Sequence, residues 1–297
     1  MIAPEDQSHA LPKERSNGAA PANAARRVVY RHSLWVRVFH WVNALSFVLL
    51  LMSGLQIFNA YPRLHWGHTG YEGIPAIFEI GGIPDLNQQV SWIQLGPHRF
   101  NTSGVFGVAK YSTFFGVFNM AFPAWMILPS GVGDLGTGMG WHFMMLWVLL
   151  INLGVYLGYA AISGRFWGDL LPDRDQLSAR AIARDLWMHI RLKHAIGIEA
   201  LRYNLLQKLS YVIVLIGLLP TMVLTGLTMS PSAVAAFPWL IELFHGRQTA
   251  RTLHFIVAWV LVLFVLIHLF QVIITGLVNN VRSMINEYFV VDEEDIT

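Results

Sequence analysis

Four long runs of apolar residues stand out along the chain, separated by polar segments. They cover Leu34–Phe58, Gly140–Ile162, Leu205–Met229 and Thr252–Val278, and the middle of each run carries no acidic or basic residue. A helix needs about 20 mainly apolar residues to cross the hydrocarbon core of a bilayer, and every run reaches that length. The pattern therefore predicts an all-α integral membrane protein built on four spanning helices.

Two shorter segments have other patterns. Residues 112–128 are apolar but short for a span, and they contain Asn119 and Pro123, so we predict an interfacial or re-entrant segment there. Residues 180–194 are basic and amphipathic. They predict a helix along the inner membrane surface, with a solvated linker helix as an equal alternative.

The basic residues between the runs indicate the orientation. Five Lys and Arg residues precede the first run and seven lie in residues 163–204, against three in residues 59–139. Because Lys and Arg are enriched on the cytoplasmic side, we predict a bacterial inner-membrane protein with both termini in the cytoplasm. Residues 59–139 are then a long periplasmic loop and 163–204 a cytoplasmic loop. Residues 1–30 are predicted to be a disordered cytoplasmic tail, and 286–297 an acidic cytoplasmic tail.

Composition agrees with a membrane protein and narrows the chemistry. Hydrophobic residues make up 55% of the 297 positions and charged residues only 13%, whereas soluble domains carry about 25% charged residues. The formal net charge of +2 gives no reason to expect a nucleic-acid partner. The chain has no cysteine, which excludes disulfides, thiolate-bound iron–sulfur clusters and thioether-linked haem. Histidine, present twelve times, remains as the strong ligand for a transition metal.

Four of these histidines lie inside the apolar runs. Ionisable side chains are costly in a bilayer and usually face the bundle interior with a partner. In the predicted orientation, His40 and His268 lie toward the cytoplasm, and His142 and His254 toward the periplasm. The fourteen residues between His254 and His268 place them about 40° apart around the helix axis and about 21 Å apart along it. The histidines thus form two pairs at two depths.

Two imidazoles at each depth match the axial ligands of a haem iron. A zinc ion would need three or four protein ligands at one depth, and ordinary core histidines bonded to backbone carbonyls have no reason to pair by depth. The segments Ser53–Leu55, Thr225–Leu227 and Thr275–Leu277 each carry a glycine. Glycine allows the close approach of a flat porphyrin, or of a neighbouring helix.

Three arginines stand within two turns before these histidines: Arg37, Arg247 and Arg251. Arginine can bind the propionates of a haem through charge-assisted hydrogen bonds. The alternative is that they are interfacial arginines with their charged ends in water. We interpret them as candidate propionate contacts, and we favour this role more for Arg251 than for the other two.

Segments from all four runs resemble one known family. They are "WVRVFHW" followed by "SGL", "GWHFMMLWVLLINLGVYLGYAAISGRFW", "YNLLQKLSYVIVLIGLLPTMVLTGLTMSP" and "GRQTARTLHFIVAWVLVLFVLIHLF". Over residues 31–285 the chain resembles the bacterial cytochrome b-561 family, which includes membrane cytochrome b subunits of nickel–iron hydrogenase, thiosulfate reductase and formate dehydrogenase. The resemblance implies a four-helix bundle that encloses two b-type haems. It implies His40 and His268 as ligands of the cytoplasmic-side haem, and His142 and His254 as ligands of the periplasmic-side haem.

The resemblance also implies quinone chemistry and a partner redox protein. In the formate dehydrogenase type, the quinone sits near the cytoplasmic haem and the start of the third helix. That position reads "YNLLQK" here, which makes Asn204, Gln207 and Lys208 the candidate quinone-site residues. The alternative is an ordinary interfacial helix start.

The loop of residues 59–139 is longer than the short turn that minimal family members need. It contains "PRLHWGHTGYEG", and we interpret it as a docking cap for a periplasmic partner. Family members with a long loop of this kind resemble those that are paired with molybdopterin oxidoreductases. His65 and His68 could form a metal site, but a polar loop surface is the favoured interpretation.

The leading functional prediction is a di-haem cytochrome b that transfers electrons between a periplasmic oxidoreductase and a membrane quinone, ubiquinone or menaquinone. A self-contained superoxide:quinone oxidoreductase is the alternative, with Arg247 and Arg251 beside an open outer haem, although the long loop would cover that haem. A transporter would need a polar path at mid-membrane, and a plain anchor would not need depth-paired histidines. The direction of electron flow is left open.

Overall fold

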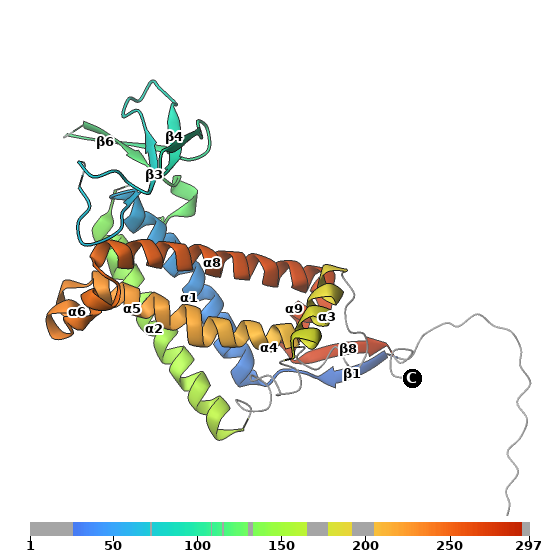
Figure 1. Ribbon diagram of the computed structural model, residues 1–297. Helices are drawn as coiled ribbons and strands as arrows, with labels where there is room; N and C mark the ends of the chain where they lie inside the picture. The colour runs from blue at the N-terminus through green and yellow to red at the C-terminus, as the bar shows by residue number, and fades with distance from the viewer. Residues whose placement is uncertain are drawn as a thin grey trace, which may run out of the picture.

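The computed structural model is a helical bundle with a strand-rich unit at one end and the first and last described strands, residues 26–30 and 288–292, at the other (Figure 1). It describes residues 26–71, 73–107, 109–114, 116–129, 133–164, 178–191 and 205–292. We call the strand-rich unit, residues 60–134, the strand cap. The name terminal clasp is used for strand β1 (Arg26–Tyr30), helix α9 (Leu277–Asn286) and strand β8 (Tyr288–Asp292).

Four helices are long and apolar enough to cross a membrane. They are α1 (Leu34–Asn59), α2 (Leu135–Ile162), the continuous stretch Leu205–Met229 and α8 (Arg247–Ile274). The prediction of four spans is confirmed, and the protein is a multi-pass membrane protein. The fourth span begins earlier than predicted, at Arg247. It also ends earlier, because Gly276 has a φ of 105° and separates α8 from α9.

The third span changes its helical form near its middle. It consists of α4 (Leu205–Val212), the π-helical turn η5 (Ile213–Leu218) and α5 (Leu219–Met229). Pro220 is the second residue of α5. Because proline has no backbone N–H, the regular i to i−4 hydrogen bond is lost at that point, and the wider π turn precedes it.

Small and polar side chains fill the contacts between the spans. Ser46, Ser53 and Thr225 are buried, whereas most apolar side chains of the spans face outward, where lipid would cover them. Asn152 of α2 donates to Asn43 Oδ1 of α1 at 2.7 Å and to the carbonyl of Phe39 at 3.0 Å. Small residues and interhelical hydrogen bonds are the usual means by which helices associate in lipid.

The segment between α1 and α2 is folded as antiparallel strands, which the all-α prediction missed. One sheet has the order β2 (Arg63–Leu64), β3 (Phe78–Gly82), β4 (Ser91–Leu95) and β5 (His98–Asn101). A hairpin follows, formed by β6 (Ala109–Thr113) and β7 (Gly116–Met120), and then a short 3-10 helix, η1 (Ala124–Met126).

The segment at residues 112–128, expected to be interfacial or re-entrant, consists in its described residues of the end of β6, strand β7 and helix η1, and its place relative to the membrane surface stays a prediction. Two of its apolar residues are buried: Met120, the last residue of β7, and Phe122, which follows that strand. A turn with Thr113 opposite Gly116 closes the hairpin, and the φ of 125° at Gly116 suits a glycine in such a turn.

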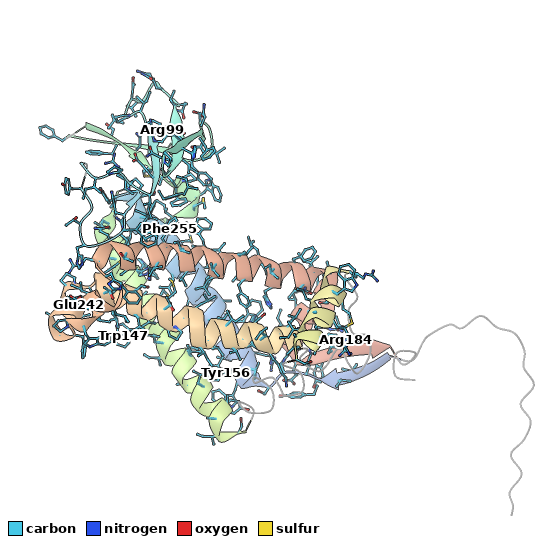
Figure 2. All side chains as sticks on the ribbon, viewed as in Figure 1. Arg99, Trp147, Tyr156, Arg184, Glu242 and Phe255 are labelled. Atoms are coloured by element: carbon cyan, nitrogen blue, oxygen red, sulfur yellow. The ribbon has the colours of Figure 1, made fainter. Side chains whose placement is uncertain are left out.

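An aromatic cluster fixes the strand cap on the bundle. Phe255 of α8 stacks on Phe58 of α1 with ring centres 4.6 Å apart and lies 5.4 Å from Phe78 of β3. Phe122, which lies in the cap between β7 and η1, is 5.9 Å from Phe58 and 6.2 Å from Trp259 of α8. Figure 2 shows Phe255 at this junction, below the sheet that carries Arg99. The cap is thus anchored to two spans at once.

The segment "PRLHWGHTGYEG" holds the start of α8. The carbonyl of Gly67 accepts hydrogen bonds from the backbone N–H groups of Gln248 (3.1 Å) and Thr249 (3.3 Å). These are N–H groups that a helix cannot satisfy internally. Gly246 has a φ of 120°, and a Cβ there would lie 2.2 Å from the Gly67 oxygen, so only glycine fits. Two short helices, α6 (Pro231–Ala236) and α7 (Trp239–Leu243), lead into this contact.

The opposite end carries the terminal clasp and helix α3 (Ala179–Ile190) (Figure 1). Strand β1 pairs with β8 in antiparallel register, from Arg26 opposite Asp292 to Tyr30 opposite Tyr288. Residues 26–30, assigned to the disordered tail from the sequence, and residues 288–292 of the acidic tail are therefore paired strands. The amphipathic helix predicted at 180–194 is present as α3 within the described residues, and its place on a membrane surface stays a prediction.

Candidate functional site

The four span histidines meet in two pairs. The rings of His142 (α2) and His254 (α8) have their centres 6.3 Å apart, and those of His40 (α1) and His268 (α8) 6.2 Å apart. A ligating imidazole nitrogen lies about 2 Å from its metal and about 1 Å from its own ring centre, so two imidazoles in line across one ion have centres about 6 Å apart. Both pairs have this spacing.

The pairs lie at two levels of the bundle. We call His142 and His254 the cap-side pair, and His40 and His268 the clasp-side pair. Leu261 lies seven residues from each α8 histidine, which at about 100° per residue puts it on the same helix face, and it is buried. Apolar packing therefore separates the two levels.

The start of α2 is set eight residues before His142. The Asp134 side chain accepts a hydrogen bond from the backbone N–H of Thr137 at 3.0 Å, which makes it the N-cap of α2. The side chain and backbone of Thr137 hold the pKa of the Asp134 carboxyl below its usual value, so the cap is ionised at neutral pH. An acidic N-cap also suits the positive end of the helix dipole.

A serine on α1 fixes the ring of His142. Ser53 Oγ donates to the carbonyl of Leu49 at 2.7 Å, and lies 3.0 Å from His142 Nδ1. Because the hydroxyl proton of Ser53 points to that carbonyl, the hydroxyl oxygen accepts the Nδ1–H of the ring. The network therefore assigns the ring proton to Nδ1 and leaves the lone pair of Nε2 available for a metal.

A threonine on α5 repeats this arrangement for His254. Thr225 Oγ1 donates to the carbonyl of Thr221 at 2.6 Å, and lies 3.0 Å from His254 Nδ1. Because the hydroxyl proton of Thr225 points to that carbonyl, the hydroxyl oxygen accepts the Nδ1–H of His254. Both cap-side histidines thus present Nε2, each held by a hydroxyl on the neighbouring helix, as ligating histidines usually are.

Glycines beside these hydroxyls let the rings approach the helix backbones. A Cβ at Gly54 would lie 3.5 Å from His142 Cε1, and one at Gly226 would lie 3.5 Å from His254 Cε1. The third glycine that the sequence suggested, Gly276, has no neighbour within 4 Å of such a Cβ and terminates α8 instead. The helix contact expected there is not made by the described residues, and the porphyrin contact stays a prediction.

The clasp-side pair is more open. His40 is half-buried, and its ring lies 5.3 Å from that of Trp41, while His268 is exposed and stacks on Phe264 at 6.4 Å. Burial lowers the pKa of the nearby His32 to about 4, helped by the charges of Arg31, His40 and Arg37. His32 is therefore neutral at physiological pH and adds no charge beside this pair.

Arg251 lies one turn before His254 and joins the cap to α8. Its guanidinium donates to the carbonyl of Arg63 at 3.1 Å and to that of Tyr61, and stands 5.2 Å from the Tyr61 ring centre. The hydroxyl of Tyr61 is buried and has no hydrogen-bond partner within the described residues. A buried donor without a partner is costly, so a further acceptor beside Arg251 would be stabilised here.

The other two arginines differ from Arg251. Arg37 donates to the carbonyl of Ile285 and pairs with Glu287 at 2.7 Å, so two of its N–H directions are already in use. Arg247 is the first residue of α8 and is exposed. The propionate role inferred from the sequence stays a prediction for all three arginines.

Two of the three candidate quinone residues lie within the residues that the structure describes. Asn204 lies outside the described residues. Lys208 of α4 is buried, with 7% of its surface exposed, whereas Gln207 is exposed. A buried lysine in a membrane span is a candidate functional residue.

His65 and His68 have different surroundings. His65 is buried against the Tyr61 ring, with Nε2 3.3 Å from the carbonyl of Ile74, whereas His68 is exposed. In the part of the chain that the structure describes, no three His, Asp or Glu side chains gather into a metal site.

The comparisons with known proteins agree on one family. The family model described as prokaryotic cytochrome b561 matches residues 31–287. The chain is similar to a putative protein-methionine-sulfoxide reductase subunit, YedZ1, of Azospira oryzae, with 29% identity over 243 residues, which are 81% of this chain and 89% of that protein. It is also similar to the putative cytochrome YdhU of Escherichia coli K12, with 26% identity over 268 residues, 88% of this chain and 74% of that protein.

No solved structure matches the chain. The family match nevertheless covers all four spans and both histidine pairs. Members of this family are membrane electron-transfer proteins that bind b-type haem. The chain belongs to the prokaryotic cytochrome b561 family.

Proposed function

We propose that the chain binds two b-type haems, one at each histidine pair, and transfers electrons between a periplasmic oxidoreductase and a membrane quinone. The observation that carries this proposal is the ring-centre spacing of 6.3 Å and 6.2 Å in two pairs at different depths. Each pair joins two different spans, so a planar group can lie between facing helices. A bound haem would supply one-electron chemistry at each level.

The residues around the cap-side pair fit a haem. His142 and His254 each have Nδ1 engaged by a hydroxyl, which leaves Nε2 for iron. Gly54 and Gly226 keep bulky side chains away from both rings. The unpaired hydroxyl of Tyr61 beside Arg251 would donate to a propionate, which supports the propionate role inferred for Arg251.

The clasp-side pair is proposed as the haem that exchanges electrons with quinone. His40 and His268 would be its ligands, with Arg37 as a weaker propionate candidate, while Arg247, at the start of α8, is a weaker candidate for the cap-side haem. Lys208, supported by its burial in a span, would hold or deliver a proton at the quinone, together with Asn204 and Gln207 at the same helix start. This assignment places the termini in the cytoplasm and the strand cap in the periplasm, as the basic residues favour.

The strand cap is proposed as the docking site of the partner oxidoreductase. Its support is the anchoring of the cap on α1 and α8, which keeps it beside the cap-side pair. The relative from Azospira oryzae carries the name of a methionine-sulfoxide reductase subunit, which favours a partner that acts on an oxidised substrate. The molybdopterin type of partner rests on the sequence resemblance alone.

Haem stoichiometry tests the proposal. The purified protein should give two haems per chain in the pyridine haemochrome assay, and a reduced-minus-oxidised spectrum with b-type bands. A redox titration should resolve two one-electron steps. One haem per chain would disprove the two-level assignment, and the absence of b-type bands would disprove haem binding altogether.

Removing the hydroxyls behind the cap-side ligands should alter one haem only. Ser53→Ala and Thr225→Val each remove a hydrogen bond to Nδ1, which weakens the imidazole as a donor to iron, so the midpoint potential of that haem should rise. Loss of such a partner also lowers affinity for the metal group by about 10-fold to 100-fold. The measurement is a redox titration with haem retention on dilution.

Matched controls are available on the same helices. Ser46 of α1 and Thr228 of α5 are equally buried, and Thr228 Oγ1 donates to the carbonyl of Leu224 rather than to a histidine. Ser46→Ala and Thr228→Val should leave both potentials unchanged. Equal shifts in the controls, or a shift of the clasp-side haem alone, would contradict the proposed role of the hydroxyls.

A further inference from the structure

Helix α9 has two faces of opposite character. Successive residues of a helix are about 100° apart, so the apolar side chains of α9 fall within one arc of about 120° around its axis. They are Leu277, Val278, Val281, Met284 and Ile285. The remaining arc carries the polar side chains of Asn279, Asn280, Arg282, Ser283 and Asn286. The helix is therefore amphipathic along its whole length.

The terminal clasp already uses the polar face of α9. Asn279 exchanges two hydrogen bonds with Val290 of β8, at 2.8 Å and 3.0 Å. Asn280 Oδ1 accepts a hydrogen bond from Arg31 at 3.0 Å. Ser283 is buried, and its hydroxyl donates to the carbonyl of Asn280. The polar face thus holds α9 on the two ends of the chain.

The apolar face stays open among the residues that the structure describes. Val278 is 79% exposed, Ile285 57% and Leu277 48%. Contact between apolar side chains and water is unfavourable, and an amphipathic helix gains stability when it buries such a face. The apolar face of α9 therefore calls for a cover from outside the described residues.

The end of α8 sets the depth of α9 in the membrane. The span α8 ends at Ile274, and α9 begins three residues later, after Gly276 turns the chain with a φ of 105°. Ile273 is exposed at the end of the span, where lipid would cover it. Leu277 and Val278 follow it within five residues and are exposed as well. The apolar surface of the span therefore continues onto α9.

The start of α1 gives the same depth independently. The indole N–H of Trp41 donates to the carbonyl of Met284 at 3.0 Å, and Arg37 donates to the carbonyl of Ile285, so α9 lies against the first turns of this span. Trp35 and Trp41 are exposed there, and tryptophan is enriched at the boundary between lipid and water. Two spans thus place α9 at the level of the membrane surface.

We propose that α9 lies along the membrane surface at the clasp end, with its apolar face against the acyl chains of the lipid. Lipid is the occupant because the spans α8, directly before α9, and α1, directly beside it, already expose apolar residues to lipid. The proposal depends on these spans and on the two faces of α9, not on haem or quinone. Because Trp41 follows His40 on α1, the lipid contact would hold the terminal clasp beside the clasp-side pair.

Spin labels on single cysteines test this placement. The chain has no cysteine, so Val278→Cys and Ile285→Cys each give the full-length protein one site for a nitroxide label on the apolar face. The labelled proteins are placed in nanodiscs of phosphatidylcholine. Power-saturation EPR then measures collisions with oxygen, which concentrates in lipid, and with nickel-EDDA, which stays in water. The ratio of oxygen to nickel collisions should be several-fold higher on the apolar face than at a site in water.

Ile273→Cys and Asn286→Cys are the matched references. Ile273 is exposed near the end of the α8 span, and Asn286 is exposed on the polar side of α9. The labels at positions 278 and 285 should match the label at 273 and differ from the label at 286. Equal access of nickel-EDDA to positions 278, 285 and 286 would overturn the proposal.

A protein cover would give a different result from a lipid cover. If neither oxygen nor nickel-EDDA reaches the label at 278, and its EPR lines narrow on dilution with unlabelled chain, a second copy covers the face. If neither reaches it and dilution has no effect, another part of the same chain covers the face. Either result contradicts the lipid contact.

Discussion

Replacing His254 by alanine is expected to reduce the haem content from two per chain to one, and the haem that remains should be the clasp-side one. His268→Ala should have the opposite result, with only the cap-side haem left. The reason is that each substitution removes one of two imidazoles at a single level, while the other pair, about 21 Å away along α8, keeps both ligands. The readouts are pyridine haemochrome quantitation and a redox titration that shows one step instead of two.

Two controls distinguish loss of a haem ligand from misfolding: rescue by added imidazole, and substitution of a histidine outside the pairs. Truncation at position 254 leaves a cavity the size of the ring, so added imidazole should restore part of the second haem. His68 is exposed on the strand cap, and His68→Ala should keep two haems. Retention of both haems in folded His254→Ala and His268→Ala proteins would refute the ligand assignment, and so would loss of the same haem in both.

The four spans and the depth pairing could be read from the sequence because both depend on local rules. Span length follows from bilayer thickness, and the fourteen residues between His254 and His268 fix their relative angle and rise on one helix. The partners of these histidines followed from orientation alone, since His40 and His142 both lie near the start of their spans and the two spans run in opposite directions across the membrane. The structure brings the same pairs together.

The contacts that hold the two ends of the chain could not be read in this way. Arg37 meets Glu287 across 250 positions, and β1 pairs with β8 across a similar separation. Such pairings depend on how the helices return to the same membrane surface, which no local pattern records. For that reason the sequence suggests a haem contact or an interfacial arginine for Arg37, and does not reveal that Glu287 balances its charge within the clasp.

The strand cap was missed for a different reason. Its strands are two to five residues long and are interrupted by glycines, so they lack the sustained alternation that marks a strand in sequence. The sequence suggests a role for the glycines beside Ser53 and Thr225 but does not predict that the two hydroxyls contact histidines. Each stands directly before the glycine in a matching S-G-L or T-G-L segment, but the contact with a histidine depends on how α1 crosses α2 and how α5 crosses α8.

Gly226→Leu is expected to abolish the cap-side haem while Gly226→Ala retains it. A Cβ at this position would lie 3.5 Å from His254 Cε1, an ordinary van der Waals contact, so alanine fits. The further carbons of leucine extend from that Cβ into the space of the ring and would displace His254 from its iron. The haem content should fall from two to one per chain in Gly226→Leu, measured by pyridine haemochrome, with the clasp-side potential unchanged.

The same contrast should hold for Gly54, where a Cβ would lie 3.5 Å from His142 Cε1, and a lipid-facing glycine provides the control. Gly158 of α2 has no atom within 4 Å of such a Cβ. Gly158→Leu should therefore keep both haems, and leucine is also a better helix former than glycine. If Gly54→Leu and Gly226→Leu retain two haems, the cap-side rings are free to move away from these backbones. The close approach of each histidine ring to a glycine backbone would then have no part in holding the ligands.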